Sequence, residues 1–167
     1  MRIRQKGFSL IELLVVVAII MIIAAIAIPN LLRSKMAANE SSAVGSLRTI
    51  NTAELTYATA YPNVGYSVDL PSLTGLPATC ATTATSAQSC LIDAVLANAT
   101  AAPTAKSGYF FTYNLNGAAG GINTAYTLEA SPANAGTTGQ RYFFTDQTGV
   151  IRYGLTGVAD TTSSAIQ

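Results

Sequence analysis

A long uncharged segment near the N-terminus constrains the fold of this chain more than any other feature. Residues 13–28 are sixteen residues without a charge, and extending the segment back to Phe8 gives twenty-one. As an α-helix, this length spans about 31 Å, close to the hydrocarbon thickness of a bilayer. The segment is therefore predicted to span a membrane. A cleaved secretory signal would have a shorter apolar core, but the small residues Ala24, Ala25 and Ala27 near its far end leave that alternative open.

Basic residues precede the apolar segment. Arg2, Arg4 and Lys6 stand there with no acid among them. Positive charge tends to stay on the cytoplasmic side of a membrane, so everything after Pro29 is expected on the opposite side.

One carboxylate, Glu12, interrupts the apolar sequence. An acid at the centre of a membrane helix costs roughly 2.5–3.5 kcal/mol. Glu12 lies near the cytoplasmic end, where the cost is lower, so a tolerated interfacial acid is one interpretation. The other begins with cleavage after Gly7, a residue whose missing side chain would let a protease approach the backbone. The new ammonium at Phe8 would lie about 6 Å along the helix from Glu12. A neighbouring copy could then present its ammonium to Glu12, and this pair would fix the register between copies.

Composition argues against most catalytic and binding functions. Only 10% of the residues are charged, against roughly a quarter in an average soluble domain, and the net charge is +1, so no basic patch indicates nucleic acid. Without residues 1–7, six basic and eight acidic side chains remain, which gives −2. The chain has no histidine, and its acids are dispersed, so we expect no enzyme, cofactor or small-molecule substrate. Residues 117–121 are glycine-rich but lack the Lys and Ser/Thr that follow in a phosphate loop. Asp146 is interpreted as a turn cap rather than a calcium ligand, so no metal is expected.

Residues 30–61 are predicted to continue the helix as an amphipathic half. Pro29 has no amide proton and disfavours helix at Ile28, so a kink is expected there. An apolar stripe then recurs at steps of three, four or seven, formed by Met36, Ala43, Leu47, Ile50, Tyr57 and Tyr61. Polar and charged residues lie mostly off that stripe: Arg33, Lys35, Asn39, Glu40 and Arg48. Pro62 and Gly65 are expected to end the helix.

Cys80 and Cys90 are the only cysteines. Two thiols without histidine cannot complete a four-ligand zinc site in one chain, so a disulfide is predicted if this region lies outside the cytosol. Two free, buried thiols remain the alternative for a reducing compartment.

The rest of the chain, residues 62–167, is predicted to be a globular body. Residues 62–107 are loop-rich, with one short helix at 91–96. Aromatic and β-branched runs at 109–113, 126–130, 142–145 and 150–153 predict an antiparallel sheet within 108–155, with Asp146–Gly149 as a hairpin turn. A polar tail, residues 160–167, is expected to be frayed. The predicted fold is α+β: a long N-terminal helix packed on a C-terminal antiparallel sheet of three or four strands.

The N-terminal residues resemble a known family. Lys6-Gly7-Phe8-Ser9-Leu10-Ile11-Glu12, the apolar run and Pro29-Asn30 are similar to the class III signal of type IV pilins and pseudopilins, over about 25 residues. The sequence 142–152 is similar to the final hairpin of many members. The chain departs from the family at Met21, where many members have glycine, and at Cys80 and Cys90, which precede the strands instead of bracketing the last hairpin.

This resemblance implies a function. A prepilin peptidase would cut between Gly7 and Phe8 and methylate the amino group of Phe8, and Glu12 would serve subunit docking. The leader 1–7 would be removed, and residues 8–29 would form the transmembrane and filament-core helix. A single-pass inner-membrane precursor, with its body in the periplasm, would assemble with other copies and other pilins through an inner-membrane platform and a cytoplasmic ATPase. The expected product is a type IV pilus on the cell surface. A pseudopilin of a type II secretion system and a non-polymerising, signal-anchored periplasmic protein remain as alternatives.

Overall fold

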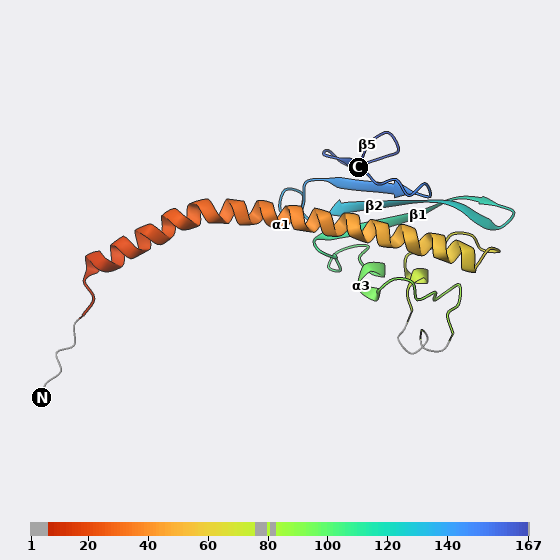
Figure 1. Cartoon of the computed structure of the whole chain (residues 1–167), viewed down its shortest axis with the longest axis horizontal. Coiled ribbons are helices and arrows are strands. Elements are labelled where there is room, and N and C mark those ends of the chain that lie inside the picture. The colour runs from red at the N-terminus through yellow and green to blue at the C-terminus, as the bar shows by residue number, and fades with distance from the viewer. Residues whose placement is uncertain (1–6, 76–79, 81–82, 167) are drawn as a thin grey trace, which may run out of the picture. The chain divides into compact units, whose positions relative to one another are not determined.

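The computed structural model describes residues 7–75, 80 and 83–166, so most of the predicted leader, residues 1–6, lies outside the described residues. Its elements are α1 (Leu10–Ala60), the 3-10 helix η1 (Pro71–Leu73), α3 (Ala94–Ala97) and the strands β1 (Tyr109–Ala119), β2 (Ile122–Pro132), β3 (Tyr142–Asp146), β4 (Arg152–Gly154) and β5 (Ser164–Ala165). The predicted α+β fold is confirmed (Figure 1). The chain forms two compact units, residues 1–35 and residues 36–167, and the boundary between them lies within α1.

The first unit contains the apolar part of α1. It is long and apolar enough to cross a bilayer, judged by length and composition. The helix runs through Pro29 without interruption, and the kink that the sequence predicts at this residue remains a prediction. The proline removes one backbone hydrogen bond, and helix continues on both sides of it.

The second unit uses the other part of α1 as one layer of its core. Ala43, Leu47, Ile50 and Tyr57 of the predicted stripe are buried. Each fully buried aliphatic side chain of this kind stabilises the fold by about 1.5–3 kcal/mol. Glu40, one of the residues that the sequence places mostly off the stripe, is only 7% exposed, and the Gln140 N–H donates a hydrogen bond to its carboxylate.

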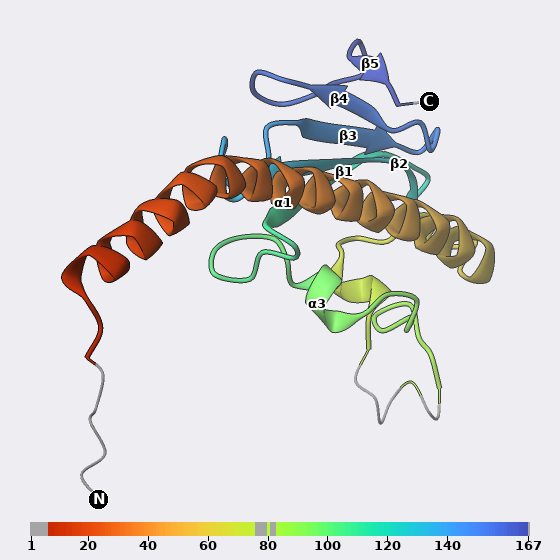
Figure 2. The same ribbon diagram turned by 60° about the vertical axis from the view of Figure 1, so that its left-hand side comes forward.

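A five-stranded antiparallel sheet forms the second layer, in the order β1-β2-β3-β4-β5, and this part of α1 lies across one of its faces (Figure 2). Alternate residues of β1, β2 and β3 face the helix and share one apolar core with it: Tyr109, Phe111, Tyr126, Leu128, Ala130 and Phe143. The β3–β4 connection is the predicted hairpin turn, in which Gly149 has φ +74° and donates its N–H to the Asp146 carbonyl oxygen at 2.9 Å. The left-handed conformation explains a glycine at this position.

The sheet is longer and has one more strand than the sequence predicts. β1 and β2 each extend to eleven residues. The tail, predicted to be frayed, instead contributes β5, in which Ser164 pairs with Tyr153 and Ala165 with Arg152. Arg152 also donates from Nη1 to the Ser163 carbonyl oxygen at 2.9 Å, so backbone and side-chain bonds hold this polar segment without an apolar pattern.

The region between helix and sheet is loop-rich, as predicted. Its short helix α3 begins three residues later than expected, at Ala94, because the Asp93 side chain accepts a hydrogen bond from the Leu96 N–H and caps the helix there.

Candidate functional site

The N-terminal part of α1 carries the residues that the sequence singled out. Gly7, Phe8 and Ser9 are not helical, and α1 begins at Leu10. The peptide bond between Gly7 and Phe8 therefore lies outside the helix. Phe8 is 89% exposed, so both residues of the predicted cleavage site are accessible in the single chain.

Glu12 has a specific hydrogen-bond partner. Its Oε2 accepts the backbone N–H of Ser9 at 2.9 Å, while the Ser9 carbonyl oxygen accepts the N–H of Leu13 at 3.3 Å. Ser9 and Glu12 thus form half of a capping box. The carboxylate of Glu12, the third residue of the helix, accepts the backbone N–H of Ser9, the residue that precedes the helix. This role was not predicted from the sequence, although the pattern Ser-x-x-Glu is visible there. An acid in the first turn is also favoured by the helix dipole.

The surface around Glu12 is apolar. All seventeen large apolar side chains from Phe8 to Leu32 are exposed. A shallow hollow beside the carboxylate is lined by Phe8, Ile11, Glu12, Val15 and Val16. Continuous apolar surface of this extent marks contact with lipid or protein. The arrangement provides one anionic group surrounded by surface that water solvates poorly.

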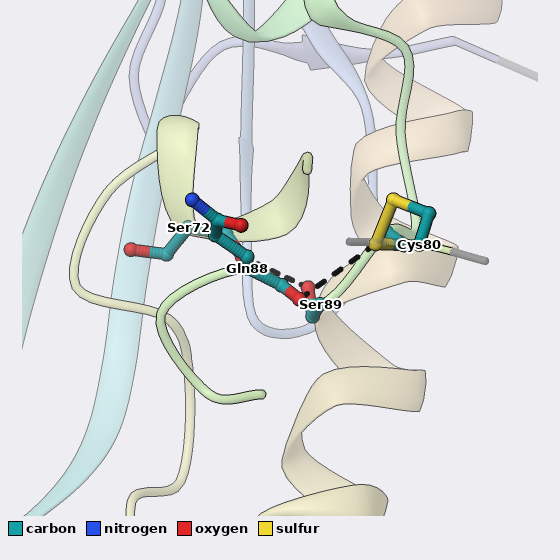
Figure 3. The surroundings of a disulfide bond; sticks show 5 residues. Ser72, Cys80, Gln88 and Ser89 are labelled. Atoms are coloured by element: carbon teal, nitrogen blue, oxygen red, sulfur yellow. Dashed lines mark hydrogen bonds between the residues drawn. A yellow bond between two sulfur atoms is a disulfide. The ribbon is translucent and has the colours of Figure 1, made fainter. Parts of the chain in front are cut away.

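The predicted cysteine pair forms a disulfide between Cys80 and Cys90, with Cα atoms 5.7 Å apart. Ser89, the residue before Cys90, is bonded to η1: its N–H and its Oγ both donate to the Ser72 carbonyl oxygen, at 3.0 and 2.9 Å (Figure 3). The disulfide also lies against Gly75, where an added Cβ would come within 2.5 Å of Cys90 Sγ and 2.7 Å of Cys80 Sγ. Sequence reasoning missed Gly75, because nothing in its neighbourhood marks it as more than a loop residue.

Asp146 acts as a turn residue. Its Oδ1 accepts the Thr148 N–H at 2.9 Å, and the Thr148 hydroxyl donates to the same oxygen at 2.5 Å. Among residues 7–75, 80 and 83–166, no three metal-ligating side chains come together. The structure therefore gives Asp146 a role in holding the hairpin.

The N-terminal segment matches a known family model, the prokaryotic N-terminal methylation motif, over residues 2–28. Phe8, Glu12 and the apolar part of α1 all lie inside this match. The match covers the segment and leaves the body untested.

Two curated relatives are pilus proteins. The type IV major pilin protein PilA of Myxococcus xanthus is 46% identical over 54 residues, 32% of this chain and 24% of the relative. The type IV wide pilus major component PilA4 of Thermus thermophilus is 45% identical over 69 residues, 41% of this chain and 46% of the relative. The aligned parts span about a quarter and about half of these relatives. No solved structure gave a significant match to the chain.

Proposed function

We propose that this chain, which carries the N-terminal methylation motif and is similar over part of its length to two type IV pilus proteins, is a structural subunit of a type IV pilus. The observation that carries the proposal is the position of Glu12 in the first turn of α1: it is the one carboxylate within residues 8–32, where all the large apolar side chains are exposed. Such a helix is unstable in water by itself. It needs lipid before assembly and other copies of the same helix afterwards.

Apolar burial supplies the driving force for this exchange. Each square ångström of apolar surface removed from water stabilises the buried state by about 25 cal/mol. Burial of this kind has no direction, so it cannot by itself fix how far one helix slides along another. A charged pair in the same surface fixes that position, since an unpaired charge there is costly.

Glu12 has the capacity for this pairing. A carboxylate accepts about four hydrogen bonds, and in the single chain the Ser9 N–H occupies one position on Oε2. The ammonium of Phe8 from a neighbouring copy would take positions that remain. Glu12 would then cap its own helix through Ser9 and also fix the position of the neighbouring subunit along the helix axis.

Processing would produce that ammonium. A prepilin peptidase would cut between Gly7 and Phe8 and methylate the amino group of Phe8, as the methylation motif supports. The precursor would be anchored in the inner membrane with the body on the periplasmic side, and an assembly platform would move it into the pilus. The exposed, non-helical segment around Gly7 fits this step, because a protease binds its substrate in an extended form.

The test compares Glu12→Gln with Glu129→Gln, the same chemical change placed in the body. Sheared surface fibres would be quantified by electron microscopy, and membrane-bound subunit would be quantified by immunoblotting. Loss of the charge at Glu12 should leave insertion intact and abolish fibres, while Glu129→Gln should assemble normally. Fibres at the wild-type number with Glu12→Gln would refute the docking role.

Mass spectrometry of the same preparations tests processing. Mature subunits should begin at a methylated Phe8. Chains that still begin at Met1 in assembled fibres would contradict the cleavage proposal.

A further inference from the structure

Glu54, the third acid on α1, has no role in the function proposed above. Glu54 lies in the body, is fully buried, and shares its surroundings with the apolar core residues Ala53 and Tyr57. No local pattern in the sequence explains an acid at this position. Its contacts do.

Glu54 binds one short segment, residues 67–69. Its Oε2 accepts the Ser67 backbone N–H at 2.9 Å, and its Oε1 lies 2.5 Å from the Ser67 Oγ. The same Oγ lies 3.1 Å from the Asp69 carbonyl oxygen. Tyr113 of β1 also bonds to this segment: its hydroxyl donates to the Ser67 carbonyl oxygen at 2.8 Å.

The hydrogens in this chain of contacts can be counted. Ser67 has one hydroxyl hydrogen, and the Asp69 carbonyl oxygen can only accept. If Glu54 is ionised, the Ser67 hydroxyl can donate its hydrogen either to Glu54 or to the Asp69 carbonyl oxygen. The other of these two contacts then has no hydrogen and is not a hydrogen bond. If Glu54 is protonated, its own hydrogen goes to the Ser67 Oγ, and the Ser67 hydrogen goes to Asp69. Only the neutral acid places a hydrogen in both contacts.

The surroundings of Glu54 agree with this count. The titratable groups that face Glu54 are Tyr57 on α1, Tyr113 on β1 and Tyr126 on β2, and none is a cation. Within the described residues the two ion pairs lie elsewhere, at Glu40–Arg141 and Asp93–Lys106. Burial raises the pKa of Glu54, and the hydrogen bonds from Ser67 and Tyr113 offset this only in part. A buried carboxylate without a counter-ion is strongly unfavourable.

We propose that Glu54 is held as a neutral carboxylic acid whose proton joins α1 to the Ser67–Asp69 segment, and that ionisation of Glu54 loosens this joint. The joint lies in the body and does not depend on fibre assembly. Since the proton is bound more tightly in the folded body than in the unfolded chain, the contribution of the joint to stability is complete below the ordinary pKa of glutamate. It is lost as pH rises through the raised pKa.

Infrared spectroscopy tests the protonation state directly. The full chain in detergent micelles at neutral pH should show the carbonyl stretch of a protonated carboxylic acid, and this band should be lost in Glu54→Gln. The amide of the introduced glutamine can donate to the Ser67 Oγ as the acid does, so the fold should persist. Glu129→Gln is the control, because burial alone raises the pKa of Glu129, and this variant should keep the Glu54 band. A wild-type spectrum without the band, or a band that persists in Glu54→Gln, would overturn the proposal.

Hydrogen exchange gives a second measurement that needs no variant. After correction for intrinsic exchange, protection of the Ser67 amide should decrease as pH rises, relative to protection of the Leu128 amide in β2. Protection of the Ser67 amide that stays constant or increases with pH would contradict the proposed role of the Glu54 proton.

Discussion

The Nε atom of Arg141 lies 2.7 Å from Oε2 of Glu40, across 101 residues of sequence. The other carboxylate oxygen accepts the backbone N–H groups of Gln140 and Arg141, at 2.9 and 3.2 Å. The guanidinium carbon of Arg141 is also 5.7 and 5.6 Å from the ring centroids of Phe143 and Tyr153. One carboxylate on α1 thus fixes the start of β3, and its guanidinium partner lies against two rings of the sheet.

Glu40→Gln should destabilise the body. The amide nitrogen of glutamine would be a donor in place of an acceptor facing Arg141 or the backbone N–H groups. A hydrogen bond to a charged group contributes roughly 1.5–3 kcal/mol, and the 40% exposure of the Arg141 side chain reduces this, so we expect a loss of about 1–2 kcal/mol. Urea unfolding of the full chain in micelles measures it, with Glu129→Gln as the control that should lose nothing. Equal stability of Glu40→Gln and the wild type would show that the carboxylate is dispensable.

The same pair predicts how stability depends on acid. Burial raises the pKa of Glu40, but the hydrogen bonds from Gln140 and Arg141 outweigh it and leave the pKa below the ordinary value. The contribution of Glu40 to stability is therefore complete above the ordinary glutamate pKa and is lost as pH falls through the lowered one. The difference in unfolding free energy between the wild type and Glu40→Gln should shrink over this acidic range. A difference that grows with acidification would contradict the assignment.

Gly75→Ala should destabilise the cysteine-closed loop, because the new methyl group would overlap both sulfur atoms. Overpacking of this kind typically costs about 1–3 kcal/mol. Gly45→Ala is a matched control: Gly45 lies in exposed helix with no other group within 4 Å of an added Cβ, and the change should stabilise α1 by about 0.5–1 kcal/mol. Thermal unfolding measures the stability of both variants. A Gly75→Ala variant as stable as the wild type would show that the loop can shift to make room for the methyl group.

Removal of the disulfide also tests the contact between Gly75 and the two sulfur atoms. Cys80→Ala with Cys90→Ala should lower the unfolding free energy by about 2–3 kcal/mol, as expected for a small closed loop. Because the sulfur atoms are then gone, Gly75→Ala should cost less in this background than in the wild type. Equal costs in the two backgrounds would show that the sulfur atoms do not restrict Gly75.

The sequence predicts those parts of the chain in which neighbouring residues decide the structure. The apolar part of α1, the stripe from Ala43 to Tyr57 and the hairpin turn at Gly149 all follow from local pattern. Ser164 and Ala165 carry no strand pattern, and they form β5 only because β4 offers an unpaired edge. The partners of Glu40 could not be predicted either, since they lie about 100 residues away and only the fold brings them together. At the candidate site, local pattern identified Gly7, Phe8 and Glu12, whereas the register between copies depends on partners outside one chain.

Pro29→Ala should strengthen the helix around it. The proline ring provides no N–H for the carbonyl oxygen of Ala25, four residues earlier, whereas alanine restores that hydrogen bond. Proline is about 3 kcal/mol less favourable than alanine in a helix interior, so part of this difference should appear as slower amide exchange in residues 30–33. Exchange at Leu128 in β2 serves as the control and should not change. If exchange after residue 29 is equally fast in the variant, the proline does not weaken the helix, and the kink that the sequence predicts there loses its physical basis.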